Sequence, residues 1–226
     1  MIPLNILTFY HNLKNIPENM KKNYEKMKLN NPEFHFEIFD NESGYKFIKE
    51  NFDILVSQAF QKLKPYSYKS DLFRFCYMYA NGGIYIDIKY QCINDFKFIN
   101  LIDKEYLVSE PLGVQTCLLI LKPNNELLLN CINDIVEKTI NNYYSFTPLW
   151  SGPFLLSEQY KILYNDENNQ INNILSWKNT GLQIICMNDN EILKEYDSYR
   201  NDLQLNSDQP HYTTMFWDKN IFYNNI

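Results

Sequence analysis

The chain has 226 residues and a formal net charge of −6, with 45% hydrophobic and 16% aromatic residues. This length suits one sizeable core, so we expect a single domain over residues 1–226, and the composition excludes a disordered chain. The acidic balance disfavours nucleic acid as a partner, so an anionic ligand must meet locally placed positive charge.

The cellular compartment is indicated by what the chain lacks. The N-terminal residues MIPLNILTFYHN show no basic start followed by an apolar stretch and a cleavage site, and no apolar run approaches the roughly 18 residues needed to span a bilayer. The five cysteines have no CxxC spacing and lie mostly in apolar surroundings, which is typical of reduced, buried thiols. We therefore expect a cytoplasmic protein without a transmembrane segment.

The first third of the chain alternates between strand and helix patterns. An apolar run at 4–10 predicts a strand, a Lys- and Glu-rich segment at 18–29 predicts a helix, and alternation at 33–39 predicts a second strand. Two more helices are expected at 43–51 and 52–63. A β-α-β opening implies a Rossmann-like, mixed but mainly parallel sheet flanked by helices.

The most informative stretch is 68–90, YKSDLFRFCYMYANGGIYIDIKY. Apolar side chains recur at helical spacing up to Tyr79, with Ser67 or Ser70 available as the N-cap. Asn81-Gly82-Gly83 then ends the helix, because glycine tolerates the left-handed backbone common at helix C-termini and leaves room for a ligand beside the turn.

A strand is expected at 84–90, directly after that turn. Alternation places its isoleucines on one face and Tyr85, Asp87 and Lys89 on the other, so one face belongs to the core and the other can carry chemistry. Asp71 and Arg74 are neighbours at i, i+3 on the preceding helix and can reach this strand. A simple surface ion pair is the alternative interpretation of those two residues.

Further elements are expected along the rest of the chain. They are strands at 106–110, 115–121 and 182–187, helices at 124–141 and from Pro153 onward, and a loop or hairpin edge at 165–180.

The stretch resembles a known family, the family-32 "DXD" glycosyltransferases, which include yeast-type α-mannosyltransferases and, more distantly, clostridial toxin glucosyltransferases. Their motif, S-D-x-x-R-x-x-x-L-x-x-x-G-G-x-Y-x-D-x-D, is matched by Ser70, Asp71, Arg74, Met78, Gly82, Gly83, Tyr85 and Asp87. Lys89 stands where the family has its second Asp of the DXD pair.

The resemblance implies a GT-A type α/β fold, with a nucleotide-sugar half at about 1–95 and an acceptor half at about 96–226. It implies a retaining transferase that moves a sugar from a UDP- or GDP-linked donor to a glycan, protein or other hydroxyl acceptor. Asp71, Arg74 and Asp87 take the catalytic positions, and donor contacts fall on the residues Gly82, Gly83, Tyr85 and Lys89. A non-catalytic module that binds a sugar nucleotide or glycan is the alternative.

Two outlying segments add donor candidates by the same resemblance. Tyr10 falls where the family has a Trp that stacks on the nucleobase, although a core Tyr is the other interpretation. His211 and Trp217 resemble the H-x-x-x-x-x-W tail of related sugar transferases, in which the His contacts metal or diphosphate and the Trp the phosphate side.

The acceptor side is expected at Trp150-Ser151-Gly152, which resembles the family's T-G-P segment with Pro153. Trp150 is either a platform for a sugar ring or a core residue. Glu110, Gln115 and Thr116 are candidates for the sugar pocket by position alone.

The sequence departs from the family at the metal position, because the family's paired Asp residues hold Mn²⁺ or Mg²⁺ against the diphosphate. A protonated Lys89 cannot ligate a metal. Three alternatives follow: Asp87 and His211 hold the ion with fewer protein ligands, Lys89 itself neutralises the diphosphate, or catalysis is lost.

Overall fold

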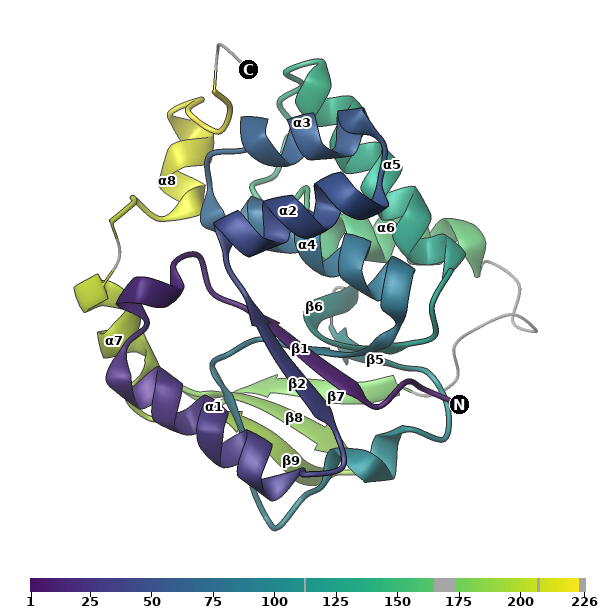
Figure 1. Ribbon diagram of the computed structural model, residues 1–226, viewed down its shortest axis with the longest axis vertical. Coiled ribbons are helices and arrows are strands. Elements are labelled where there is room, and N and C mark those ends of the chain that lie inside the picture. The colour runs from purple at the N-terminus through teal and green to yellow at the C-terminus, as the bar shows by residue number, and fades with distance from the viewer. Residues whose placement is uncertain (112, 165–173, 207, 224–226) are drawn as a thin grey trace.

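The computed structural model describes residues 1–111, 113–164, 174–206 and 208–223 (Figure 1). The strands are β1 (Asn5–Phe9), β2 (His35–Phe39), β3 (Gly83–Ile86), β4 (Tyr90–Cys92), β5 (Tyr106–Glu110), β6 (Gly113–Leu121), β7 (Ile174–Asn179), β8 (Gln183–Met187) and β9 (Asn190–Glu195). The α-helices are α1 (Glu18–Asn30), α2 (Asn41–Asn51), α3 (Ile54–Lys62), α4 (Tyr66–Asn81), α5 (Glu126–Ile140), α6 (Pro153–Leu163), α7 (Tyr199–Asn206) and α8 (Tyr212–Trp217). Short 3₁₀ turns lie at η1 (Leu13–Asn15) and η2 (Phe98–Leu101).

The strands form one mixed sheet in the order β2-β1-β3-β6-β5-β7-β8-β9-β4. The predicted β-α-β opening is confirmed, since β1 and β2 pair in parallel and α1 connects them. The expectation of a mainly parallel sheet is wrong. Among the described strands, β1–β2, β1–β3 and β5–β7 pair in parallel and the other five pairs are antiparallel. Short connections such as those between β7, β8 and β9 cannot form the crossover that a parallel pair needs.

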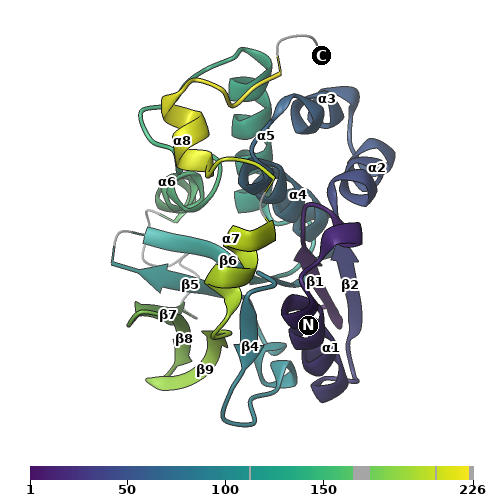
Figure 2. The ribbon, with the colours of Figure 1, turned by 90° about the vertical axis from the view of Figure 1, so that its left-hand side faces the viewer.

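Helices cover both faces of the sheet. Figures 1 and 2 both show α2 to α6 stacked on one side, with α1 on the other. The two apolar cores follow from strand alternation: Leu7 and Tyr85 point toward the larger helical layer, whereas Ile6, Ile84 and Ile86 point toward the side of α1. Among the described residues, no helix is long and apolar enough to cross a membrane.

Local sequence signals explain most helix boundaries. Asp40 caps α2 through a reciprocal capping box with Ser43. The predicted N-cap of α4 is wrong, because the helix begins one residue after Pro65 and encloses both Ser67 and Ser70. The amide of Lys69 already donates to the Pro65 carbonyl, so the helix is under way before Ser70.

The predicted strand at 84–90 is interrupted, which corrects the sequence analysis. β3 ends at Ile86, where the Asp87 amide donates to the Cys117 carbonyl, and the Tyr90 amide then donates back to the Asp87 carbonyl. β4 pairs only with β9, at the far edge of the sheet. Because three residues join β3 to β4 while five strands stand between them, the sheet must curl back on itself. Asp87 and Lys89 lie in the connection that closes this curl.

The Asn-rich segment predicted as a loop or hairpin edge divides into two parts. Residues 165–173 lie outside the described residues. Residues 174–179 form β7, which is an internal strand between β5 and β8 rather than an edge. The predicted strand at 182–187 is confirmed as β8.

Candidate active site

Helix α4 carries the two charged residues on which the site is built. Asp71 and Arg74 are both buried, and Asp71 Oδ1 lies 3.4 Å from Arg74 Nη2 one turn along the helix. A buried ion pair inside a helical layer is not the simple surface pair of the alternative interpretation. It needs a full set of partners, because an unpaired buried charge costs several kcal/mol.

Arg74 is held by four further contacts. Its Nε donates to the Ser70 carbonyl at 3.2 Å, Nη2 donates to Ser70 Oγ at 2.9 Å, and Nη1 donates to the Thr116 carbonyl at 2.7 Å. Its guanidinium carbon lies 4.4 Å from the centre of the Tyr85 ring. These contacts fix the guanidinium plane and bring β6 and β3 to α4. Thr116 therefore contributes its backbone carbonyl.

Asp87 connects α4 to the end of β3. Its Oδ1 accepts from the Tyr85 hydroxyl at 2.8 Å and lies 3.3 Å from Arg74 Nη1, while its Oδ2 lies 3.0 Å from Lys89 Nζ. The Lys89 side chain is 14% exposed and that of Asp87 is 22% exposed. We call Asp71, Arg74, Asp87 and Lys89 the charged cluster. It joins four predicted site residues, on two elements, that were expected to act together.

The second oxygen of Asp71 is bound by the segment that begins α6. Ser151 Oγ donates to Asp71 Oδ2 at 2.8 Å, and a Cβ on Gly152 would lie 2.7 Å from the same oxygen. Gly152 is therefore needed for the close approach of the Asp71 carboxylate to the helix start. Ser151 and Gly152 lie at the cluster, and their role on the acceptor side stays a prediction.

Trp150 is a core residue, 1% exposed, with its ring 5.3 Å from Tyr68 and 6.4 Å from Phe222. The expectation of a sugar platform at Trp150 is corrected by this burial, because both faces of the ring are taken up by protein. An aromatic residue beside a T-G-P-like segment gives no local signal that separates these two roles.

The Gly82-Gly83 turn is needed for its backbone conformation and leaves no space for a ligand. Both residues have positive φ, +62° and +100°. A Cβ on Gly82 would lie 2.7 Å from Pro123, and one on Gly83 would lie 2.3 Å from Asn5 Oδ1, so protein fills the space that was expected for a ligand. The turn sits at the start of β3 and the charged cluster at its end, so the glycines act by directing β3.

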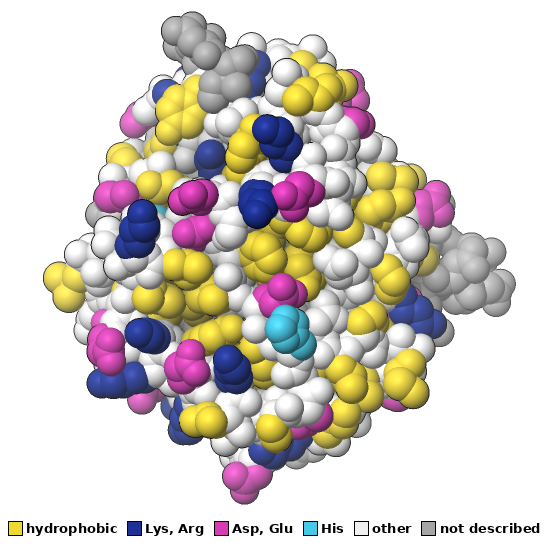
Figure 3. Space-filling view, viewed as in Figure 1, with side chains coloured by type: hydrophobic (Ala, Val, Ile, Leu, Met, Phe, Trp, Pro, Cys, Tyr) yellow, Lys and Arg dark blue, Asp and Glu magenta, His cyan; other side chains and the backbone are white. Residues whose placement is uncertain are grey.

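The pKa values of the two carboxylates, Asp71 and Asp87, are shifted in opposite directions. Burial raises the pKa of Asp71 to about 6, although Arg74 and the Ser151 hydroxyl oppose the rise. Burial acts in the same direction on Asp87, but the positive charges of Lys89 and Arg74 outweigh it and hold the pKa of Asp87 below its ordinary value. Burial lowers the pKa of Lys89, and Asp87 more than reverses this, so the pKa of Lys89 is raised and the ammonium stays charged. Acidic and basic side chains mix over the face shown in Figure 3.

Tyr10 lies near this region in an aromatic stack. It is buried beside Ile88 and Tyr196. Its ring is 4.4 Å from that of His11, which in turn stacks on Tyr66 at 4.3 Å and 8° between planes. Tyr10 thus packs as a core residue in this structure, and a nucleobase contact stays a prediction.

The C-terminal segment reaches the cluster through residues that the sequence analysis missed. Figure 2 shows α7 and α8 on the viewer's side of the sheet and of α4. Burial raises the pKa of the Tyr199 hydroxyl; Lys89 opposes this rise and Asp87 adds to it. Burial also raises the pKa of the Tyr212 hydroxyl, where Asp71 adds to the rise and Lys89 opposes it. Both hydroxyls therefore lie within electrostatic range of the charged cluster. Their only signal in the sequence was proximity to the His-Trp tail.

His211 and Trp217 themselves lie at the two ends of α8. His211 is exposed, and its Nδ1 lies 2.8 Å from Thr213 Oγ1 and caps the helix. The Trp217 side chain is 66% exposed and packs against Phe216. Their donor contacts stay predictions, since the structure brings Tyr212 rather than either of them to the cluster.

The residues around Asp87 do not fit a metal ion held by the protein. A hard divalent cation takes about six oxygen ligands, whereas Asp87 is surrounded by an ammonium, a guanidinium and a phenol. Among the described residues there is no group of three or more His, Cys, Asp and Glu side chains that could hold a metal. A site made by Asp87 and His211 therefore has no geometric support here.

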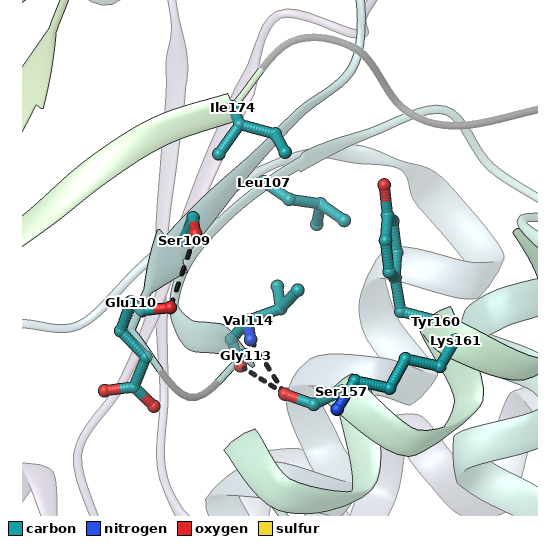
Figure 4. Close-up of a pocket in the computed structure, with 9 residues that line it drawn as sticks. All are labelled: Leu107, Ser109, Glu110, Gly113, Val114, Ser157, Tyr160, Lys161 and Ile174. Carbon is teal, nitrogen blue, oxygen red and sulfur yellow. Dashed lines mark hydrogen bonds between the residues drawn. The ribbon is translucent and has the colours of Figure 1, made fainter. Parts of the chain in front are cut away.

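An apolar cavity of about 210 Å³ lies farther along α6 (Figure 4). Ser157 Oγ joins α6 to β6, because it accepts from the Val114 amide at 2.7 Å and donates to the Val114 carbonyl at 3.4 Å. Gly152, before the first turn of α6, contacts Asp71 of the cluster, whereas Ser157, five residues later, contacts Val114 at the cavity. The cavity therefore lies about 7.5 Å along α6 from the cluster. The lining residues are Leu107, Ser109, Glu110, Gly113, Val114, Ser157, Tyr160, Lys161 and Ile174.

Comparison with known proteins identifies the architecture. The structure is similar to the solved PaToxG glycosyltransferase, with a TM-score of 0.54 and 18% identity, over 74% of this chain and 71% of that one. With the curled mixed sheet, this defines an α/β fold of the GT-A type, as the sequence predicted.

Sequence comparison finds a matching family model. Residues 17–108 match the model described as "Glycosyltransferase sugar-binding region containing DXD motif", and this part of the chain holds the whole charged cluster. The chain is 32% identical over 79 residues to the uncharacterized glycosyltransferase L373 of Acanthamoeba polyphaga mimivirus. It is 25% identical over 158 residues to the mannosyl phosphorylinositol ceramide synthase SUR1 of Saccharomyces cerevisiae. The matches cover 35% and 66% of this chain but only 32% and 40% of those relatives.

Proposed function

We propose that this protein transfers a sugar, with retention of anomeric configuration, from a nucleotide-sugar donor to a hydroxyl group of a glycan, protein or other acceptor. The observation that carries the proposal is the charged cluster at the end of β3, within the family's sugar-binding region. A neutral, hydroxyl-rich sugar needs charge-assisted hydrogen bonds, and a diphosphate needs positive charge. The cluster offers both within one contiguous set of contacts.

Each cluster residue receives a role. Asp71 and Arg74 hold hydroxyls of the donor sugar, Asp87 holds the sugar or the ribose, and Lys89 faces the diphosphate. The contacts between Arg74 and Thr116, and between Asp71 and Ser151, keep these groups in place before the donor arrives. Such preorganisation supports catalysis, because no reorganisation is needed as charge develops.

The reaction that fits these roles is a front-face substitution. The bond between the anomeric carbon and the β-phosphate oxygen breaks, and its electron pair stays on the phosphate. The acceptor oxygen forms the new bond on the same face and gives its proton to the departing phosphate. The positive charge of Arg74 and Lys89 stabilises the anionic leaving group.

The remaining parts of the donor and the acceptor are placed by position. We assign the nucleobase to the neighbourhood of Tyr10, and the acceptor to the side of Ser151, Gly152 and α6, along which the apolar cavity lies. In this assignment one domain has its nucleotide-sugar half at about 1–95 and its acceptor half at about 96–226. The five free thiols support a reducing compartment such as the cytoplasm.

The test is release of nucleoside diphosphate from a panel of UDP- and GDP-sugars. GDP-mannose belongs in the panel because one relative is named for a mannosyl product. We expect turnover of at least one donor, and loss of turnover in Asp87→Ala with the fold intact by circular dichroism. Glu18→Ala, at an exposed carboxylate on α1, is the matched control and should turn over at the wild-type rate.

The second candidate, a sugar-nucleotide-binding module without turnover, is favoured by one observation, the Lys at position 89. The same panel separates the two: donor binding by calorimetry without any diphosphate release would replace the transferase with the module. Unchanged turnover in Asp87→Ala would refute the roles assigned to the cluster.

A further inference from the structure

The residue at position 89 differs from the DXD pattern of the matched family in the sign of its charge. Lys89 occupies the second acidic position, and its ammonium is directed back to the first, with Nζ 3.0 Å from Asp87 Oδ2. Its side chain is 14% exposed, and Nζ lies 5.3 Å from the centre of the Tyr90 ring. The ammonium is therefore fixed inside the site, rather than extended into solvent as surface lysines are.

The charges of the cluster balance without another ion. Asp71 and Asp87 contribute two negative charges, and Arg74 and Lys89 contribute two positive charges. With Asp at position 89 the same cluster would carry a net charge of two negative units. Replacing Asp by Lys thus adds the charge that one divalent cation would bring.

The geometry also offers few free ligands to a divalent cation. Asp87 Oδ1 is engaged by Tyr85 and Arg74, and Asp87 Oδ2 by Lys89. A divalent ion at Asp87 would have to displace the ammonium and remain beside its like charge, which opposes binding. It would also find too few oxygen ligands among the described side chains.

We propose that Lys89 is a built-in cation which replaces a divalent metal, so that this chain binds nucleoside diphosphates without metal. The ammonium shifts from Asp87 to the diphosphate oxygens when the donor enters, and Arg74 continues to hold Asp87 from the other side. Lys is a competent phosphate ligand as a point charge. This inference rests on the proposed function and specifies the cofactor requirement of the same site.

The primary test needs no variant. UDP and GDP are titrated into the wild-type protein by calorimetry, once with EDTA and once with Mn²⁺. We expect the dissociation constant of the better-binding nucleotide to change by less than about threefold between the two conditions. Nucleotide binding that requires Mn²⁺ would overturn the inference.

Two variants test Lys89 itself, and both are measured by binding rather than turnover. Lys89→Met should weaken binding by about tenfold to a hundredfold with or without Mn²⁺, since one charge-assisted contact is lost. Lys89→Asp should bind weakly in EDTA and regain affinity with Mn²⁺, and it should bind Mn²⁺ alone, detected by electron paramagnetic resonance. Lys46→Asp, the same charge change on an exposed face of α2, should behave as wild type.

The remaining outcomes also discriminate. If Lys89→Asp folds, as shown by its circular dichroism, and gains no Mn²⁺ response, the inference is wrong. If the wild-type protein binds neither nucleotide nor any nucleotide sugar in either condition, both the proposed function and the inference are wrong. If nucleotide binding by the wild-type protein strictly requires Mn²⁺, the inference is wrong and the proposed function still stands.

Discussion

Replacing Asp71 by Asn should destabilise the free protein less at pH 8 than at acidic pH, while removing a group that the proposed reaction needs. The Asp71 side chain is 10% exposed, and burial raises its pKa from 3.8 to about 6 despite Arg74 and Ser151. The ionised carboxylate is thus held in the fold at a cost. Such a cost is expected where a buried charge serves a ligand rather than stability.

The magnitude follows from the pKa difference. Because the pKa of Asp71 is higher in the folded than in the unfolded chain, its protonated form stabilises the fold. That contribution is complete below about pH 4 and is lost as the pH rises through about 6. About two pKa units at 1.36 kcal/mol each correspond to about 3 kcal/mol in total, of which about 2 kcal/mol remains at pH 4.5.

The assay is urea denaturation of the ligand-free protein, followed by tryptophan fluorescence at pH 4.5 and pH 8. The free energy of unfolding of Asp71→Asn minus that of wild type should be about 2 kcal/mol more positive at pH 8 than at pH 4.5. Glu33→Gln, at an exposed carboxylate, is the matched control and should stay within about 0.5 kcal/mol of wild type at both pH values. An Asp71→Asn difference that is the same at both pH values would refute the reasoning about burial.

Two further pairs of variants test how the site is supported. Gly83→Ala should destabilise the protein by at least about 2 kcal/mol more than Gly181→Ala. Both glycines have φ of +100°, but only at Gly83 would the new Cβ meet Asn5, so equal urea midpoints would contradict the packing described. Trp150→Ala should cost about 3–5 kcal/mol as a core truncation. Trp217→Ala, at a 66% exposed residue, should cost less than about 1 kcal/mol by the same measurement. A larger loss of stability in Trp217→Ala than in Trp150→Ala would contradict the assignment of Trp150 to the core.

Local patterns predicted the elements that organise the site. The β-α-β opening, the capping of α2 and the helix that ends at Gly82-Gly83 all follow from short-range signals, and the structure has them. Asp71, Arg74, Asp87 and Lys89 could be grouped because helix spacing and a tight turn determine which of them meet.

Other features depend on contacts between distant segments. The strand expected to continue past Asp87 stops at Ile86, because the amide of Asp87 bonds to β6 and the chain then turns toward β9. Tyr199 and Tyr212 come within electrostatic range of the cluster only through the tertiary placement of the C-terminal helices. No periodicity within those segments carries that information.

The central claim is that Asp71 and its partners in the charged cluster bind the donor sugar through its hydroxyls. Calorimetry with the best donor and its monodeoxy analogues, on wild type and on Asp71→Asn, tests this claim directly. We expect one monodeoxy donor to bind the wild-type protein at least about tenfold more weakly than the parent, and to bind Asp71→Asn about as well as the parent does, because the lost hydroxyl and the lost carboxylate are partners. The same penalty in both proteins for every analogue would contradict the claim.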